Sequence, residues 1–253
     1  MATLSYKNMP ITAAGHTIYA SSASISESIS PTTMESVGVM GASAAYNNAI
    51  PKGSVSFSYY EDGTFATFEA LAKDNVAKVL TVGPYTITNA FLNSLSFNGE
   101  SNKPLTTDQS WDFYGTITEG APPAPATPTI NVYEVASLTN YDEAGGEIAF
   151  SFAYGMTQSY EARNYLGNVN PVLVWKNGEV SLEIEGDKLT KSLLANSTSV
   201  CLEGSKLLGL VLRQSCDHST TISVDVDGYM TSRSADVSAG DIARMNLSVI
   251  KYL

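Results

Sequence analysis

Residues that could bind a metal ion occur at two places in the sequence. Cys201, Cys216 and His218 offer two thiolates and an imidazole, which are the ligands that zinc prefers. Their spacing fits no common zinc finger and a fourth ligand is missing, so we expect a polar turn around His218. The run DVDG from Asp225 starts like a calcium loop, but YMTSRSAD follows where further ligands belong, which favours a β-turn. The sequence therefore predicts no metal site and no cofactor.

Groups for nucleophilic catalysis are equally scarce. His16 and His218 are the only histidines, and no Gly-x-Ser-x-Gly elbow occurs, so a Ser-His-Asp triad has no support. The adjacent carboxylates at 61–62 and 142–143 lie in turn-like stretches, where solvated charge is the usual role. A carboxylate pair for glycoside hydrolysis stays open, since its spacing depends on the fold. We expect that the protein is not an enzyme and has no catalytic, cofactor-binding or metal-binding residues.

The redox state of the two cysteines is left open by the sequence. Cys201 and Cys216 are the only cysteines, and both lie in strand-like surroundings. Two thiols do not make a disulfide framework in a chain of this size, although a cross-strand bridge is possible. We favour two reduced, half-buried thiols.

The composition and the net charge limit the classes of protein to which this chain can belong. The chain has 253 residues, of which 43% are apolar and only 15% charged, and it contains 14 tyrosines, a mixture that favours β-structure with many turns. The net charge of −11 disfavours tight binding to nucleic acid, because an acidic surface repels phosphate. No apolar run is long enough to span a bilayer, and the first residues do not resemble a signal peptide. We expect no membrane association, and synthesis in the cytoplasm.

A proline-rich segment divides the sequence near its midpoint. The stretch GAPPAPATPT, residues 120–129, contains four prolines and favours an extended linker. Both flanks can fold, so we predict an N-terminal β-domain over 1–120, a linker over 121–128 and a C-terminal β-domain over 129–253.

The two flanks repeat the same order of elements. Each shows a strand, a long loop, a strand with alternating apolar residues, an acidic turn, a short helix and a closing hairpin. The alignment sets these residues over each other: Gly53 and Gly178, Val55 and Val180, Phe57 and Leu182, Tyr59 and Ile184, Asp62 and Asp187, Phe68 and Leu193, Phe91 and Tyr229, Leu92 and Met230, Trp111 and Met245, Phe113 and Leu247. We therefore predict two tandem antiparallel β-sandwich or partial-barrel domains, each with one short α-helix.

The helices are expected to pack on the core of each domain. Phe65, Phe68, Leu71 and Ala72 recur at helical spacing in the first domain, with Glu69 and Lys73 as an i,i+4 pair. In the second domain Asp187 is the expected cap, and the apolar face is formed by Leu189, Leu193 and Leu194.

This organisation resembles the tail-tube fold of bacteriophages and related contractile injection systems. The openings ASISESISPTTMESVG and KGSVSFSYYEDG also look like the start of phage virion structural proteins. The resemblance implies β-sandwich subunits that assemble into stacked rings around a lumen through which DNA passes without specific binding. In this setting residues 31–53, read as a long loop, would fold against the next ring, and 161–178 are their counterpart; an ordinary surface loop is the alternative for both segments. Localisation to the virion follows from the same resemblance.

The duplication departs from the family's usual single-copy subunit. Three fused chains would form a trimer with pseudo-sixfold symmetry, and a hexamer of chains is the other arrangement. The station in the virion stays open between tail tube, neck, baseplate and capsid decoration, with other phage structural proteins as partners. A second class is a carbohydrate-binding or adhesin module, for which an aromatic platform is required. The aromatic residues available for it are Tyr59, Tyr60, Trp111, Tyr114, Tyr160 and Trp175.

Overall fold

The protein is mainly β, as its composition predicts. The computed structural model describes residues 9–28, 31–35, 42–47, 52–100, 103–124, 132–139, 149–167, 171–186, 206–215, 220–236 and 244–253. Within these residues there is one short helix, α1 (Phe65–Glu69). The strands are β1 (Met9–Ala13), β2 (His16–Ser28), β3 (Pro31–Glu35), β4 (Ala42–Asn47), β5 (Lys52–Tyr60), β6 (Lys78–Val82), β7 (Tyr85–Glu100), β8 (Thr106–Phe113), β9 (Ile117–Glu119), β10 (Tyr133–Thr139), β11 (Ala149–Arg163), β12 (Val172–Gly186), β13 (Lys206–Gln214), β14 (Thr221–Asp236) and β15 (Arg244–Tyr252).

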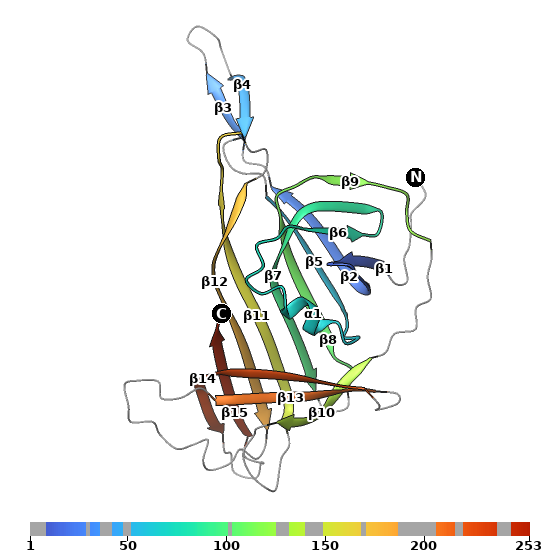
Figure 1. The fold of residues 1–253 in the computed structure, drawn as a ribbon, viewed down its shortest axis with the longest axis vertical. Coiled ribbons are helices and arrows are strands. Elements are labelled where there is room, and N and C mark those ends of the chain that lie inside the picture. Colours follow the sequence, from blue (N-terminus) through green and yellow to red (C-terminus); the bar gives the residue numbers. More distant parts are fainter. Residues whose placement is uncertain are drawn as a thin grey trace, which may run out of the picture.

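Six strands of the N-terminal half close into an antiparallel barrel. The order is β7-β6-β1-β2-β5-β8, and a further pairing of β8 with β7 closes the circle (Figure 1). Alternation of side chains decides which face is inside: Val55, Phe57 and Tyr59 of β5 are buried, whereas the serines between them point outward. A β-sandwich or partial barrel was predicted for this half, and the structure shows a closed six-stranded barrel.

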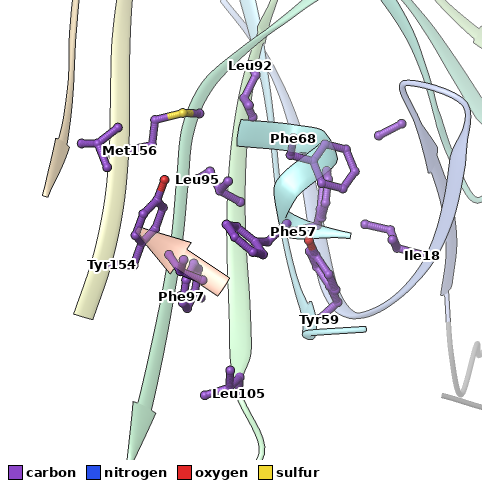
Figure 2. Close-up of a cluster of buried hydrophobic side chains, with 14 of the residues drawn as sticks. Ile18, Phe57, Tyr59, Phe68, Leu92, Leu95, Phe97, Leu105, Tyr154 and Met156 are labelled. Atoms are coloured by element: carbon purple, nitrogen blue, oxygen red, sulfur yellow. The ribbon is translucent and has the colours of Figure 1, made fainter. Parts of the chain in front are cut away.

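Helix α1 fills the barrel interior with two aromatic rings. Phe65 and Phe68 are buried, and the ring of Phe68 lies edge-on to Trp111 at 6.4 Å between centroids. Figure 2 shows Phe68 on α1 among the buried side chains. The prediction that Phe68 anchors the helix in the core is confirmed. The predicted Glu69–Lys73 pair is wrong, because α1 ends at Glu69. Glu69 instead accepts a hydrogen bond from Tyr154, and Lys73 lies over the ring of Trp175.

The strands of the C-terminal half continue the same sheet. Strand β11 pairs with the second half of β7, and the order then runs β11-β12-β15-β14-β13-β10. Strand β14 has two partners: Thr221–Gly228 pairs with β13, and Tyr229–Asp236 pairs with β15. In Figure 1, β10, β13 and the first part of β14 run across the lower end of the molecule. Their side chains, including those of Leu210 and Val226, join the same core as the barrel.

Gly228 marks the point in β14 where the partner strand changes. A Cβ atom there would lie 2.4 Å from the backbone oxygen of Ile250, so only glycine permits this approach. We expect Gly228→Ala to lower the free energy of unfolding by about 1–3 kcal/mol, measured by urea denaturation. Gly155→Ala is the matched control in β11, because the nearest atom to its Cβ is the Ser181 hydroxyl oxygen at 3.1 Å. Equal losses in the two variants would contradict this explanation.

Several sequence predictions are corrected by the strands. The long loop predicted over 31–53 contains the hairpin β3–β4 and the start of β5, and the loop predicted over 161–178 contains the distal parts of β11 and β12. These segments pair although apolar alternation is weak, because strand pairing uses backbone groups. The DVDG run lies inside β14 instead of forming a turn. The predicted second helix, with Asp187 and Leu193, lies outside the described residues.

The proline-rich segment is followed in the structure only over 121–124, where no helix or strand forms. The halves on either side of it are in direct contact. They share the β7–β11 pairing and one hydrophobic core.

The strand pairings of the barrel recur in the C-terminal half. Five of the six strand pairings in the barrel have a counterpart. The pairing β1–β6 corresponds to β10–β13, β2–β5 to β11–β12, and β5–β8 to β12–β15. The pairing β7–β8 corresponds to β14–β15, and β6–β7 to β13–β14. The sixth pairing, β1–β2, has no counterpart between β10 and β11 in the residues described.

Two bulges recur as well, and they set the equivalent residues. One residue is skipped between Ala20 and Ser22 in β2, and likewise between Ala149 and Ser151 in β11. Another is skipped between Leu92 and Ser94 in β7, and likewise between Met230 and Ser232 in β14. With these positions superposed, the registers of β5–β8 and β12–β15 agree, whereas the irregularities in β6–β7 and in β10–β13 have no counterpart in β13–β14 and β1–β6.

These registers differ in part from the sequence alignment. Leu92 and Met230 correspond in both. Val55 corresponds to Leu182 and Phe57 to Ile184, each two residues later than the partner that the sequence alignment gave. Trp111 corresponds to Val249, whereas the alignment paired it with Met245. A shift by two residues keeps the same face of a strand, so the apolar pattern alone does not detect it.

Candidate functional site: a polar sheet face with two open edges

Eight adjacent strands present one continuous face of small polar side chains. The strands are β14, β15, β12, β11, β7, β8, β5 and β2, four from each half of the chain. Directly opposed residues share a face, so rows such as Gly155, Ser96, Asp108 and Ser58 run across several strands. We call this surface the polar face. Its residues are Ser22, Ser24, Ser26, Lys52, Ser54, Ser56, Ser58, Ser94, Ser96, Asn98, Glu100, Thr106, Asp108, Ser110, Asp112, Ser151, Ala153, Gly155, Thr157, Glu179, Ser181, Glu183, Glu185, Ser232, Asn246, Ser248 and Ile250, with the exposed rings of Tyr60 and Tyr252 opposite Thr106 and Glu179.

Hydroxyl groups on the polar face bond to each other across strands. Ser24 and Ser26 of β2 lie 2.8 Å from Ser56 and Ser54 of β5, hydroxyl to hydroxyl. Ser58 donates to the carboxylate of Asp108 on β8. Such pairs link short polar side chains on neighbouring strands across the face.

The charged residues of the polar face are carboxylates, with Lys52 as the exception. The ammonium of Lys52 lies 2.7 Å from Asp112. Partial burial acts to lower the pKa of Lys52, but the hydrogen bond and the charge of Asp112 outweigh it and raise that pKa. The one basic group on this face is therefore held by a neighbouring acid, and the face as a whole repels phosphate.

The polar face is hollowed at its lower end, where the two halves meet. A cavity of about 740 Å³ is lined by residues of both halves, among them Asn98, Glu100, Ser151, Glu183 and Asn246. Lys103 at its rim forms an ion pair with Glu100. The lining also includes the core residues Phe152, Ile184 and Leu247, so the hollow is bordered both by the polar face and by the apolar core.

The polar face ends in two open strand edges. On one side, Ser22–Ser28 of β2 pairs with β5, while β1 covers only His16–Ala20 on its other edge. On the opposite side, Ser232–Asp236 of β14 pairs with β15, while β13 covers only Thr221–Gly228. Within the part of the chain that the structure describes, no strand pairs with the remaining edge of either segment. An open edge offers unpaired N–H and C=O groups to another strand.

Buried polar groups in the barrel belong to its core. Glu61 is fully buried, and its carboxylate accepts hydrogen bonds from Thr107 Oγ1 and from the backbone N–H groups of Gly63 and Phe65. Burial raises the pKa of Glu61, although these hydrogen bonds act in the opposite direction. The expectation of a solvated charge at Glu61 is therefore wrong, because this carboxylate closes the turn before α1.

The other candidate residues either lie apart from any metal-ligating group in the described ranges or fall outside those ranges. His16 lies at the start of β2, with its ring 6.4 Å from that of Phe68. Cys201, Cys216, His218 and the carboxylates at 142–143 lie outside the described residues. Within the described ranges, no group of three or more metal-ligating side chains is found.

The aromatic residues do not form a platform. Tyr59 and Trp111 are buried and are joined through the side-chain amide of Gln109. Trp175 lies under the ammonium of Lys73, and Tyr160 donates to the backbone oxygen of Asp74. Tyr60 is 47% exposed on β5. The required set of coplanar exposed rings is thus absent among the residues that the structure describes.

The polar face itself was missed by the sequence reasoning. The signal was the alternation of serine with apolar residues, as in SVSFSYY of β5 and SLSFNGE of β7. That alternation was used to find the buried side of each strand, and the other side was not followed across strands.

Comparison with known proteins adds no relative. No family model matches the chain, and no curated protein is significantly similar to it. Among the described residues, no helix has the length and apolar character needed to cross a membrane.

Proposed function

We propose that this protein is a structural subunit that assembles with copies of itself into rings, most simply the tail tube of a bacteriophage virion. The observation that carries the proposal is the polar face, which takes four strands from each half and ends in an open edge on both sides. Strands of another copy can pair with these edges, which are open in the described part of the chain, and so extend the sheet. The role includes no catalytic step and no cofactor.

The recurring pairings and bulges support an origin by duplication of one β-unit. Two units related by duplication present the same kind of edge twice, which suits repeated, head-to-tail contacts. Three copies would supply six four-stranded units, in a trimer with pseudo-sixfold symmetry, and six copies would supply twelve. A neck, baseplate or capsid-decoration adaptor would use the same contacts, and such assembly takes place in the host cytoplasm before the subunit enters the virion.

The acidic character of the polar face supports its place on the inner wall of a conduit. Carboxylates and short hydroxyl side chains offer no cationic partner to phosphate, so DNA would pass without being held. In this role the carboxylates of the polar face would have to stay negatively charged, because their charge repels the phosphates of the DNA.

Assembly is tested by electron microscopy and sedimentation of the full-length protein over a rising concentration series. We expect rings or stacked rings of uniform diameter. Monodisperse monomers at all concentrations, in the presence and absence of phage particles, would contradict the proposal.

Reversing charge on the polar face tests its exposure to DNA. We expect the double variant Glu179→Lys and Glu183→Lys, both exposed on β12, to bind duplex DNA in the assembled state, with an affinity that falls steeply with salt. The matched control is Glu119→Lys with Asp227→Lys, which makes the same change in net charge at exposed residues off the polar face. Equal DNA binding by the two variants, measured by a salt-dependent filter assay, would place the conduit elsewhere.

A further inference from the structure

The joint between the two halves of the chain is an edge-to-edge pairing of strands. Residues Ser94–Glu100 of β7 pair antiparallel with Ser151–Thr157 of β11. Leu95 lies opposite Met156, and both are fully buried. Phe97 lies opposite Tyr154, with the rings stacked at 4.6 Å between centroids (Figure 2). The polar face thus continues across the joint from the N-terminal half to the C-terminal half. On the opposite face of the sheet, buried apolar and aromatic side chains pack across the same joint.

The open edges are the counterparts of the two strands in this joint. The recurring bulges match Ser151–Thr157 of β11 with Ser22–Ser28 of β2. They match the segment of β7 that begins at Ser94 with the segment of β14 that begins at Ser232. In each case the side left without a partner, in the described part of the chain, is the side that is paired in the joint. The N-terminal half therefore has, in β2, an unpaired edge equivalent to the edge of β11 in the joint. The C-terminal half has, in β14, an unpaired edge equivalent to the edge of β7.

We propose that β14 of one copy of this chain pairs antiparallel with β2 of the next copy, and so repeats between copies the joint that β7 and β11 form within one copy. Transferring the β7–β11 register places Ser232 opposite Ser28, Ser234 opposite Ser26 and Asp236 opposite Ser24. The contact is head-to-tail, so each copy uses both edges and the assembly closes into a ring when the rotation permits. The proposal rests on the proposed function and names the surface through which that assembly forms.

The charges at this register are complementary. Arg233 comes opposite Glu27, at the positions that Leu95 and Met156 occupy in the joint within the chain. Glu27 is exposed in the single copy. Opposite charges directly across two strands favour pairing, and charged residues also keep an open edge soluble until the partner arrives. An apolar pair at the same place would stay exposed in every free subunit.

The pairing would also make the polar face continuous between copies. Ser22, Ser24 and Ser26 end that face on one side, and Ser232 begins it on the other. In the proposed register the residues of one copy meet serines of the next on the same face. The polar face then continues from one copy to the next across the proposed joint.

Charge reversal is the first test. We expect Glu27→Arg alone, and Arg233→Glu alone, to raise the concentration needed for assembly about tenfold or more, since like charges then oppose each other across the strands. The double variant Glu27→Arg with Arg233→Glu restores the pair and should assemble within about threefold of the original protein. Circular dichroism confirms that each variant is folded. A double variant no better than the single variants would overturn the proposal.

Disulfide trapping is the second test, and it reports the register. In a background with Cys201→Ser and Cys216→Ser, the pair Ser26→Cys with Ser234→Cys should give covalent oligomers under mild oxidation, because directly opposed strand positions allow a disulfide. Ser26→Cys with Ser232→Cys, two residues out of register, is the matched control and should crosslink far less. A non-reducing gel shows the ladder, and its last step counts the copies in a closed ring.

The two proposals fail in different ways. Rings that form normally, but neither crosslink between positions 26 and 234 nor respond to charge reversal, would overturn this joint and leave the structural role standing. A protein that forms no assembly at any concentration would overturn both.

Discussion

Replacing Phe68 by alanine should lower the free energy of unfolding by about 3–5 kcal/mol. The ring is fully buried where α1 enters the barrel, and it lies edge-on to both Trp111 and His16. Its removal leaves a cavity that the surrounding closed barrel cannot fill by a local shift, because the strands around it are hydrogen-bonded on both sides. Urea denaturation followed by tryptophan fluorescence measures the loss, and Trp111 reports on the same core.

The matched control for Phe68→Ala is Val76→Ala. Val76 follows α1 closely in the chain but is 64% exposed, so we expect a change within about 0.5 kcal/mol. An unchanged midpoint for Phe68→Ala would mean that α1 does not seal the barrel.

Replacing Glu61 by alanine should cost about 3 kcal/mol or more, since its three hydrogen-bond donors each lose a buried partner. Glu61→Gln should keep most of the stability. Its amide oxygen can accept from Gly63 and Phe65, and its NH₂ can donate to Thr107. The contrast separates the loss of the network from the loss of the charge.

The charge of Glu61 adds a dependence on pH. Burial raises its pKa in the folded state above the ordinary value of 4.5, so the folded protein holds this proton more tightly than the unfolded chain does. Stability from this group is complete below pH 4.5 and falls as the pH rises through the folded-state pKa. Gln does not titrate, so the stability of Glu61→Gln relative to the original protein should increase between pH 4 and pH 8. A constant difference across that range would show that the carboxyl does not change its charge state on folding.

The local sequence patterns predicted which residues of a strand are buried better than they predicted which strands pair with each other. The alternation in β5 identified Val55, Phe57 and Tyr59 as buried, and helical spacing identified Phe68 as the anchor of α1. Glu61 was assigned to solvent because it stands beside Asp62 in an acidic turn. Its burial depends on Thr107, which is remote in sequence and is brought close only when β8 pairs with β5.

The candidate site shows the same limit. Every serine of the polar face was visible in the sequence, but its membership of one surface depends on the order of eight strands. The DVDG run was assigned to a turn on its composition, whereas pairing with β13 keeps it in a strand. Loops predicted at 31–53 and 161–178 contain hairpins for the same reason.

The sequence by itself determined the mainly β class, the acidic charge, and the inner and outer side of individual strands. Only the tertiary structure decided that β7 pairs both within the barrel and with β11, that the halves share one core, and that β2 and β14 have open edges within the described ranges. The physical reason is that strands pair through backbone groups common to nearly all residues. Side-chain alternation therefore specifies which face of a strand is buried, while the choice of neighbour is settled by the packing of the whole sheet.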